Sequence, residues 1–315
     1  MKLIFLFISI LLLIYVNPAI GQKISSPTLN PDSVTWKSLI YQAKTFFGTA
    51  TAVVELNAGR QPDLPDQHEN HPTAAVEDTS QDTHRFCLSA TTTIKPYLAA
   101  NRFYQTKVWF SPENGTAIRR LRLLKGRKYY LKDYIFALSG VYRYRKKPAD
   151  SAEETVKPEF WSNTEKTFYS LPGNTSTTTI ISEPSLILYY LSAKTLKPDS
   201  RPEEICVFNK KQYYMVKLIR KAPIQLQVDY LEQQDCHNKL VKKGEMALSC
   251  YRLVSRPVAG KGEGAAEKFS FMGLTGEIKI YFNEETRIPV RISGDIPLIG
   301  RVHFNLRQVI KADRG

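Results

Sequence analysis

The chain has 315 residues, of which 43% are hydrophobic, and its 44 lysines and arginines outnumber its 30 aspartates and glutamates to give a formal charge of +14. This apolar content is enough to bury a core, and the 17 tyrosines and 15 phenylalanines favour β-sheet. Beyond residue 21 no stretch is apolar for long enough to form a membrane-spanning helix, so we expect a soluble mature protein.

The first 21 residues predict a signal peptide. Lys2 gives a positive start, residues 3–16 are apolar apart from Ser9, and small residues precede an expected cleavage after Gly21. An uncleaved anchor is the alternative, although the apolar run is shorter than the roughly 20 residues that a spanning helix needs. We therefore expect a periplasmic or secreted protein. Export argues against nucleic acid as the partner of this basic chain and favours anions such as phosphorylated glycolipid, acidic polysaccharide or a membrane surface.

After the signal peptide we expect a flexible arm over residues 22–35 and then a single β-rich domain over residues 36–315. Two stretches of this domain have the composition of loops. Residues 57–84 contain glycine, proline and many polar side chains with almost nothing apolar, which predicts an exposed, disordered insertion. Residues 146–179 are rich in lysine, glutamate, serine and threonine, and we expect a long polar loop there.

Short apolar runs between turn signals predict strands through the rest of the domain. Residues 119–124 pass through Gly126 into residues 129–131, which is typical of a hairpin. The segment that begins at Ser182-Glu183-Pro184 favours one short helix over residues 185–194.

The C-terminal part of the chain shows the most regular pattern. Apolar side chains alternate with polar ones over residues 278–282, 288–292 and 302–306. A period of two in three successive segments predicts an antiparallel meander with one buried face.

Four cysteines, at positions 87, 206, 236 and 250, would form two disulfides in an oxidising compartment, with three connectivities to choose from. Cys236 and Cys250 are close in sequence and are the expected pair, which the chain-entropy estimate values at ~3 kcal/mol. No Cys-x-x-Cys occurs, so the sequence supports neither a thioredoxin-type redox motif nor a zinc ribbon.

Basic and aromatic side chains interleave over residues 127–134 and 142–147. Tyrosine rings can stack on sugars or at headgroup boundaries while arginine and lysine hold phosphates. The polar face of the C-terminal meander carries further basic groups, although an ordinary solvated strand face would give the same residue types. The candidate ligand-binding residues are Arg127, Lys128, Tyr129, Tyr142, Arg143, Arg145, Arg291, Arg301 and His303.

Signatures of catalysis are missing from the sequence. It contains no His-Glu-x-x-His, no Gly-x-Ser-x-Gly and no Walker loop. His68 and His71, with His84 downstream, have metal-like spacing but lie in the predicted insertion, where a supporting shell for a metal is rare. We predict no cofactor, no metal and no enzymatic activity.

Three C-terminal segments resemble the end of an uncharacterised bacterial family known as domain of unknown function 3108. They are residues 276–282 (GEIKIYF), 286–292 (TRIPVRI) and 300–302 (GRV). Residues 39–41 with 48–50, and 184–191, look like the family's opening strands and its short helical segment. The resemblance implies an envelope protein of Gram-negative bacteria built mainly of β-structure, and no reaction. We expect a large curved antiparallel sheet, a half-barrel or open barrel, with one or two short helices.

Together these patterns lead to one main hypothesis and two alternatives. The main hypothesis is a non-enzymatic envelope protein that binds a lipid, a glycolipid or another anionic ligand in the concave side of the sheet. The first alternative is a structural or assembly protein that docks an envelope partner through exposed strand edges. The second is an exported hydrolase, which would need a cleft with convergent acid and base residues.

Overall fold

The computed structural model describes residues 28–58, 85–98, 100–172, 181–194, 196, 201–234, 238–258, 268–296 and 299–312. The predicted signal peptide and nearly all of the predicted insertion lie outside these residues. Within them, no helix has both the length and the apolar character needed to cross a membrane.

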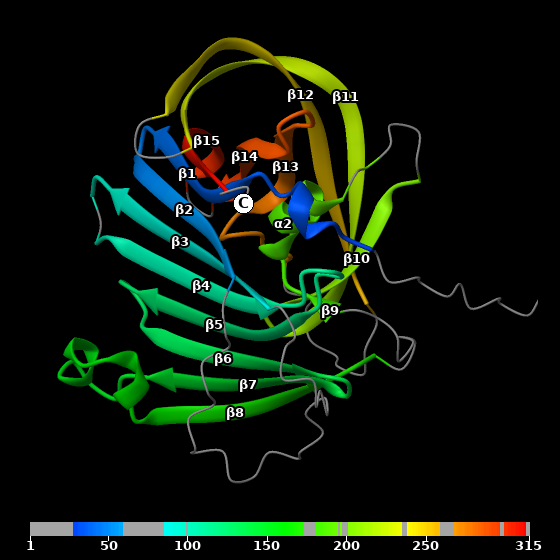
Figure 1. The fold of residues 1–315 in the computed structure, drawn as a ribbon. Coiled ribbons are helices and arrows are strands. Elements are labelled where there is room, and N and C mark those ends of the chain that lie inside the picture. Colours follow the sequence, from blue (N-terminus) through cyan, green and yellow to red (C-terminus); the bar gives the residue numbers. More distant parts are fainter. Residues whose placement is uncertain are drawn as a thin grey trace, which may run out of the picture.

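Fifteen strands form one continuous sheet in the described part of the chain (Figure 1). Its first half is an antiparallel meander in which each strand pairs with the next along the chain. These strands are β1 (Trp36–Thr45), β2 (Gly48–Ala58), β3 (Phe86–Pro96), β4 (Arg102–Phe110), β5 (Ala117–Lys125), β6 (Tyr130–Ala137), β7 (Gly140–Lys147) and β8 (Asn163–Ser170).

The second half of the sheet continues from the other side of β1, because the last strand of the chain pairs antiparallel with β1. Two long strands of this half arch over the top of the molecule in Figure 1. The strands are β9 (Ile181–Ser182), β10 (Glu203–Asn209), β11 (Gln212–Gln233), β12 (Lys239–Pro257), β13 (Thr275–Asn283), β14 (Ile288–Ile296) and β15 (Gly300–Lys311). The far end of β11 returns to the sheet and pairs with β15 at residues 308–310.

The two ends of the sheet overlap and are not joined edge to edge. Phe208 of β10 and Tyr213 of β11 pack against Tyr134 of β6 and Val141 of β7 in a small second core. The Tyr213 hydroxyl donates a hydrogen bond of 2.9 Å to the Tyr169 carbonyl oxygen in β8. The predicted mainly β fold with a large curved antiparallel sheet is confirmed.

Helix α2 (Leu186–Ala193) fills the concave side of the sheet, in the centre of Figure 1. All eight of its residues are buried, as expected for a helix that is apolar on every side. Trp36 of β1 donates its indole N–H to the Ser192 hydroxyl over 2.9 Å, so the helix is tied to the first strand. The structure confirms the predicted helix at residues 185–194.

The flexible arm predicted over residues 22–35 is wrong for residues 28–35. Leu29 and Val34 are buried in the main core, and the Leu29 N–H donates to the Glu113 carbonyl oxygen over 2.8 Å. A short 3-10 turn, η1 (Pro31–Ser33), leads into β1. Two apolar side chains were enough to fix a segment whose composition is otherwise polar.

The long polar loop predicted over residues 146–179 contains a strand. Two 3-10 turns, η2 (Glu153–Thr155) and η3 (Pro158–Phe160), lead into β8, which pairs with β7 along eight residues. The main-chain partners offered by β7 outweigh the weak strand propensity of this polar segment. The predicted insertion at residues 57–84 also begins late, because β2 continues to Ala58.

The predicted Cys236–Cys250 disulfide is not formed. Cys250 is a free thiol in β12, opposite Lys221 of β11, and Cys236 lies outside the described residues. A strand rises about 3.3 Å per residue, so Cys250 lies about 36 Å along β12 from Lys239, where the strand begins. Cys236 precedes Lys239 by three positions in the sequence, and three steps of chain span at most about 11 Å. Closeness in sequence therefore did not bring the two cysteines together.

Candidate anion-binding face

Five basic side chains share the concave face of three neighbouring strands, and we call this set the basic face. It consists of Arg120 and Arg122 of β5, Lys132 of β6, and Arg143 and Arg145 of β7. The face is fixed by register. Arg120 lies opposite Val108 of β4, which is fully buried in the core, and Arg122 lies two positions further along the same strand. Because strand side chains alternate, both arginines point to the concave side.

The carboxylates beside the basic face neutralise only part of its charge. Glu165 of β8 forms ion pairs with both Arg143 and Arg145, and Glu183 lies 3.3 Å from the Arg120 guanidinium. Within the described residues, Arg122 and Lys132 form no ion pair with a carboxylate. Five cations and two carboxylates leave this surface with an excess of positive charge.

Lys132 is at the centre of the basic face. Register places it between Arg122 of β5 and Arg145 of β7. Its ammonium group lies 4.4 Å from the centre of the Tyr130 ring. Burial, reinforced by repulsion from Arg122, Arg143 and the other arginines, lowers the pKa of Lys132 to about 7. An anion bound here would relieve that repulsion and keep the lysine protonated.

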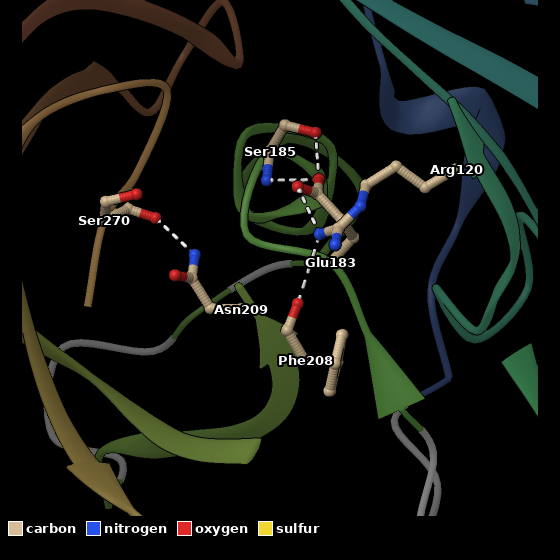
Figure 2. Close-up of polar contacts among 6 residues, drawn as sticks. All are labelled: Arg120, Glu183, Ser185, Phe208, Asn209 and Ser270. Atoms are coloured by element: carbon tan, nitrogen blue, oxygen red, sulfur yellow. Dashed lines mark hydrogen bonds and ion pairs between the residues drawn. The ribbon is translucent and has the colours of Figure 1, made fainter. Parts of the chain in front are cut away.

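Arg120 belongs to a buried polar cluster that ties three parts of the fold together (Figure 2). Its guanidinium donates to Glu183 over 3.3 Å and to the Phe208 carbonyl oxygen over 3.2 Å. Glu183 in turn accepts hydrogen bonds from the backbone N–H and the hydroxyl of Ser185, at the start of α2. Arg120 also lies over the Tyr134 ring, 3.9 Å from its centre. This arginine therefore joins β5 to β10 and to the beginning of the helix.

Several donors of the basic face, and one of the neighbouring Tyr134, are buried and have no hydrogen-bond partner within the described part of the chain. They are Nε and Nη2 of Arg120, Nε of Arg143, Nε of Arg145 and the hydroxyl of Tyr134. Buried polar groups are normally paired, because an unpaired donor costs free energy. N–H donors of this kind match the oxygens of a phosphate or carboxylate.

Toward the β5–β6 turn the same face becomes apolar and aromatic. Leu124 of β5 lies between Tyr104 of β4 and Tyr130 of β6, and all three residues are half-buried. The concave face thus changes along its strands from arginine and lysine to tyrosine and leucine. This order of chemistry suits a ligand with a charged headgroup and an apolar or sugar portion.

Only two of the sequence-predicted binding residues, Arg143 and Arg145, belong to the basic face. Tyr142 points to the opposite side of β7, where its ring lies 4.6 Å from that of Phe168. Arg127 and Lys128 are exposed in the β5–β6 turn, and the Tyr129 ring lies 6.3 Å from that of Trp161. The alternation of side chains along a strand separates residues that are adjacent in the sequence.

The three predicted residues of the C-terminal meander lie elsewhere. Arg291, Arg301 and His303 occupy the outer face of β14 and β15, separated from β5 in the sheet order by β1 to β4. Arg301 pairs with Asp295 over 2.9 Å, and Nδ1 of His303 lies 2.7 Å from the Ser293 hydroxyl. These residues do not form one site with the basic face.

Two cavities lie beside the β11–β12 arch. One of about 260 Å³ is lined by Leu226, Leu248 and Arg291, whose guanidinium donates to Asn305 and to the Gln227 carbonyl oxygen. The other, of about 470 Å³, contains Arg220, which forms two hydrogen bonds with Glu284. In both cavities the guanidinium is already used to hold neighbouring segments of the protein together.

Among the residues described, no group of three or more histidine, cysteine, aspartate or glutamate side chains is arranged to hold a metal ion. His68, His71 and His84, which have metal-like spacing in the sequence, lie outside the described residues.

Comparisons with known proteins give little information on the function of the chain. No family model matches it, and no curated protein sequence does. Among solved structures it is similar to the crystal structure of a β-barrel-like protein from Brucella abortus, which belongs to domain of unknown function 1849. The identity is 9% and the TM-score 0.48, with 91% of this chain and 100% of that chain covered. Nothing in these matches bears on the resemblance to domain of unknown function 3108, which stays a prediction.

Proposed function

We propose that this protein is an exported, non-catalytic envelope protein that binds the anionic headgroup of a lipid or glycolipid on the basic face. The observation that carries the proposal is the register of three strands, which sets Arg122, Lys132 and Arg145 side by side on the concave surface. Glu165 is the one carboxylate that forms an ion pair with any of these three among the described residues. Such a cluster of cations attracts and orients an anion.

The neighbouring side chains favour an amphiphile over a simple inorganic ion. Tyr104, Leu124 and Tyr130 extend the face with apolar surface that a small ion would not use. Helix α2 occupies the centre of the concave side, so the proposed ligand is held by its headgroup and the adjoining portion. The sequence-based hypothesis put the ligand on the concave side of the sheet, and this placement restricts it to part of that side.

Native mass spectrometry and lipid extraction of protein purified from its own host test this proposal. We expect the wild-type protein to carry an anionic lipid or glycolipid, and the variant Arg122→Gln/Lys132→Gln to lose it. The matched control Lys107→Gln/Lys166→Gln replaces two exposed basic residues of β4 and β8 and should keep the ligand. Wild-type protein without any bound anionic amphiphile, or equal loss from both variants, would contradict the proposal.

A second function is supported by the position of β8. This strand ends the sheet order, and among the described residues no strand pairs with its outer edge. An edge of eight residues can accept an added strand from a partner, as in the predicted docking of an envelope protein. Cross-linking in cells from a photoreactive residue at the exposed position Lys166 tests it. A stable protein adduct without bound lipid would favour docking over ligand binding.

A further inference from the structure

Four large apolar side chains project from two adjacent turns of the first half of the sheet, and we call them the apolar rim. Phe46 is 89% exposed and Phe47 53% in the β1–β2 turn, while Tyr97 is 61% and Leu98 100% exposed in the β3–β4 turn. The two turns lie next to each other at the left of Figure 1. A cluster of exposed large apolar side chains marks a surface that binds a protein, a membrane or a ligand.

Backbone contacts hold the two turns of the rim together. The Tyr97 N–H donates to the Phe47 carbonyl oxygen over 3.1 Å. Gly48 packs so closely on the next strand that an added Cβ atom would lie 2.5 Å from the Lys95 carbonyl oxygen. The backbone of the rim is therefore already ordered, so binding through these side chains costs little conformational entropy.

The charged residues around the rim are all positive. The β5–β6 turn is its neighbour, because a Cβ atom added to Gly126 would lie 2.7 Å from the Asn101 carbonyl oxygen. The segments around these turns, residues 43–49, 94–103 and 123–129, contain six lysines and arginines and no aspartate or glutamate. Lys44, Lys95 and Arg127 are exposed beside the apolar side chains.

We propose that the apolar rim docks this protein onto an anionic membrane surface, with Phe46, Phe47, Tyr97 and Leu98 inserted at the headgroup boundary. Apolar side chains in the interface and lysines facing anionic headgroups are the two contributions on which peripheral membrane binding depends. A membrane is favoured over a second copy of this chain as the occupant, because two such rims would bring like charges together. The docking surface is distinct from the basic face and does not depend on a ligand there.

Tryptophan fluorescence, taken as the difference between a variant and the wild-type protein, gives a test that reports on the rim. The three native tryptophans, Trp36, Trp109 and Trp161, are all buried, so an indole introduced at an exposed position has its own signal. For Leu98→Trp we expect a blue shift, and quenching by brominated acyl chains, on addition of phosphatidylethanolamine vesicles that contain phosphatidylglycerol. Pure phosphatidylcholine vesicles, or high salt, should weaken both effects. Leu138→Trp, exposed in the β6–β7 turn at the other end of the strands, should show neither.

Sedimentation with the same vesicles gives a second measurement. We expect Phe46→Ser/Leu98→Ser to lower the partition coefficient by at least about tenfold, because each inserted side chain contributes favourable transfer free energy. Both residues are exposed, so this variant should fold normally. No vesicle-dependent shift for Leu98→Trp, or the same shift for Leu138→Trp, would overturn the proposal even if the protein sediments with vesicles. A shift that grows with protein concentration in the absence of lipid would assign the rim to self-association and overturn it as well.

Discussion

The residues of the basic face lie in a strongly positive environment, and the pKa of Lys132 shows its effect most directly. Its pKa is lowered to about 7, first by burial and then by the arginines on the neighbouring strands. A lysine in an unfolded chain has a pKa of about 10.4. The charged form is thus disfavoured in the folded protein. Below about pH 7 the lysine is charged in both states, and its burial lowers the free energy of unfolding by the full amount. As the pH rises from about 7 toward about 10.4, this destabilisation disappears.

The low pKa of Lys132 predicts how anion binding depends on pH. Affinity for short-chain phosphatidylglycerol should fall as the pH rises through about 7, because Lys132 then loses its proton. Lys132→Arg should bind equally well on both sides of this range, since arginine stays charged. Isothermal titration calorimetry at a series of pH values checks this. A wild-type affinity that does not change between about pH 6 and about pH 9 would show that Lys132 does not contact the anion.

The Arg120–Glu183 pair is expected to matter for stability. Arg120→Met leaves the buried Glu183 carboxylate without its partner, and we expect a loss of about 3–5 kcal/mol in the free energy of unfolding. Glu183→Gln keeps an acceptor for Ser185 but should also destabilise, because it leaves Arg120 uncompensated. The double variant should lose less than the sum of the two single variants. Urea unfolding measures this coupling, and strictly additive losses would mean that the two charges do not interact.

At the residue scale the sequence predicted part of the basic face. The interleaved tyrosines point to Arg143 and Arg145 but not to Arg122 and Lys132. A signal was present: a hairpin turning at residues 126–129 sets Arg122 opposite Lys132. Local pattern points to the wrong side of β5, since Leu121 and Leu123 on its outer side are more apolar than Arg120 and Arg122 on its inner side.

Among the elements, α2 is the one on which the packing of the concave side depends. Leu188 is fully buried in the main core, whereas Leu138, in a turn, is 73% exposed. We expect Leu188→Ala to lower the free energy of unfolding by about 2–5 kcal/mol through the cavity it leaves. Leu138→Ala should change it by less than about 0.5 kcal/mol. Urea unfolding curves of both variants test the assignment, and a similar midpoint for the two would place the helix outside the cooperative core.

Elements with a strong local pattern were predicted well. The three C-terminal strands have the expected inward residues, and the helix begins and ends where expected. β8 was missed because it is polar and forms only against β7. Residues 213–219 and 224–230 are two apolar runs with Pro223 between them, and they form one strand, β11, whose register shifts there. A proline at such an irregularity does not end the strand.

The whole molecule combines one curved sheet with charge concentrated on particular surfaces. The family resemblance predicted the curved sheet, but no local pattern predicts that β10 packs face to face on β6 and β7. That overlap depends on contacts between residues far apart in the chain. It leaves part of the concave side of β5 to β7 lined by the basic face, next to the turns that carry the apolar rim.

The most direct test of the proposed function is a titration of the protein with short-chain phosphatidylglycerol and phosphatidylcholine, followed by NMR of isotope-labelled arginine and lysine side chains. Phosphatidylglycerol should bind saturably, shift the signals of Arg122, Lys132 and Arg145, and bind at least about tenfold more weakly to Arg122→Gln/Lys132→Gln, because charged hydrogen bonds are lost. Shifts confined to Arg291, Arg301 and their neighbours, or equal affinity of the variant, would contradict the assignment of the site.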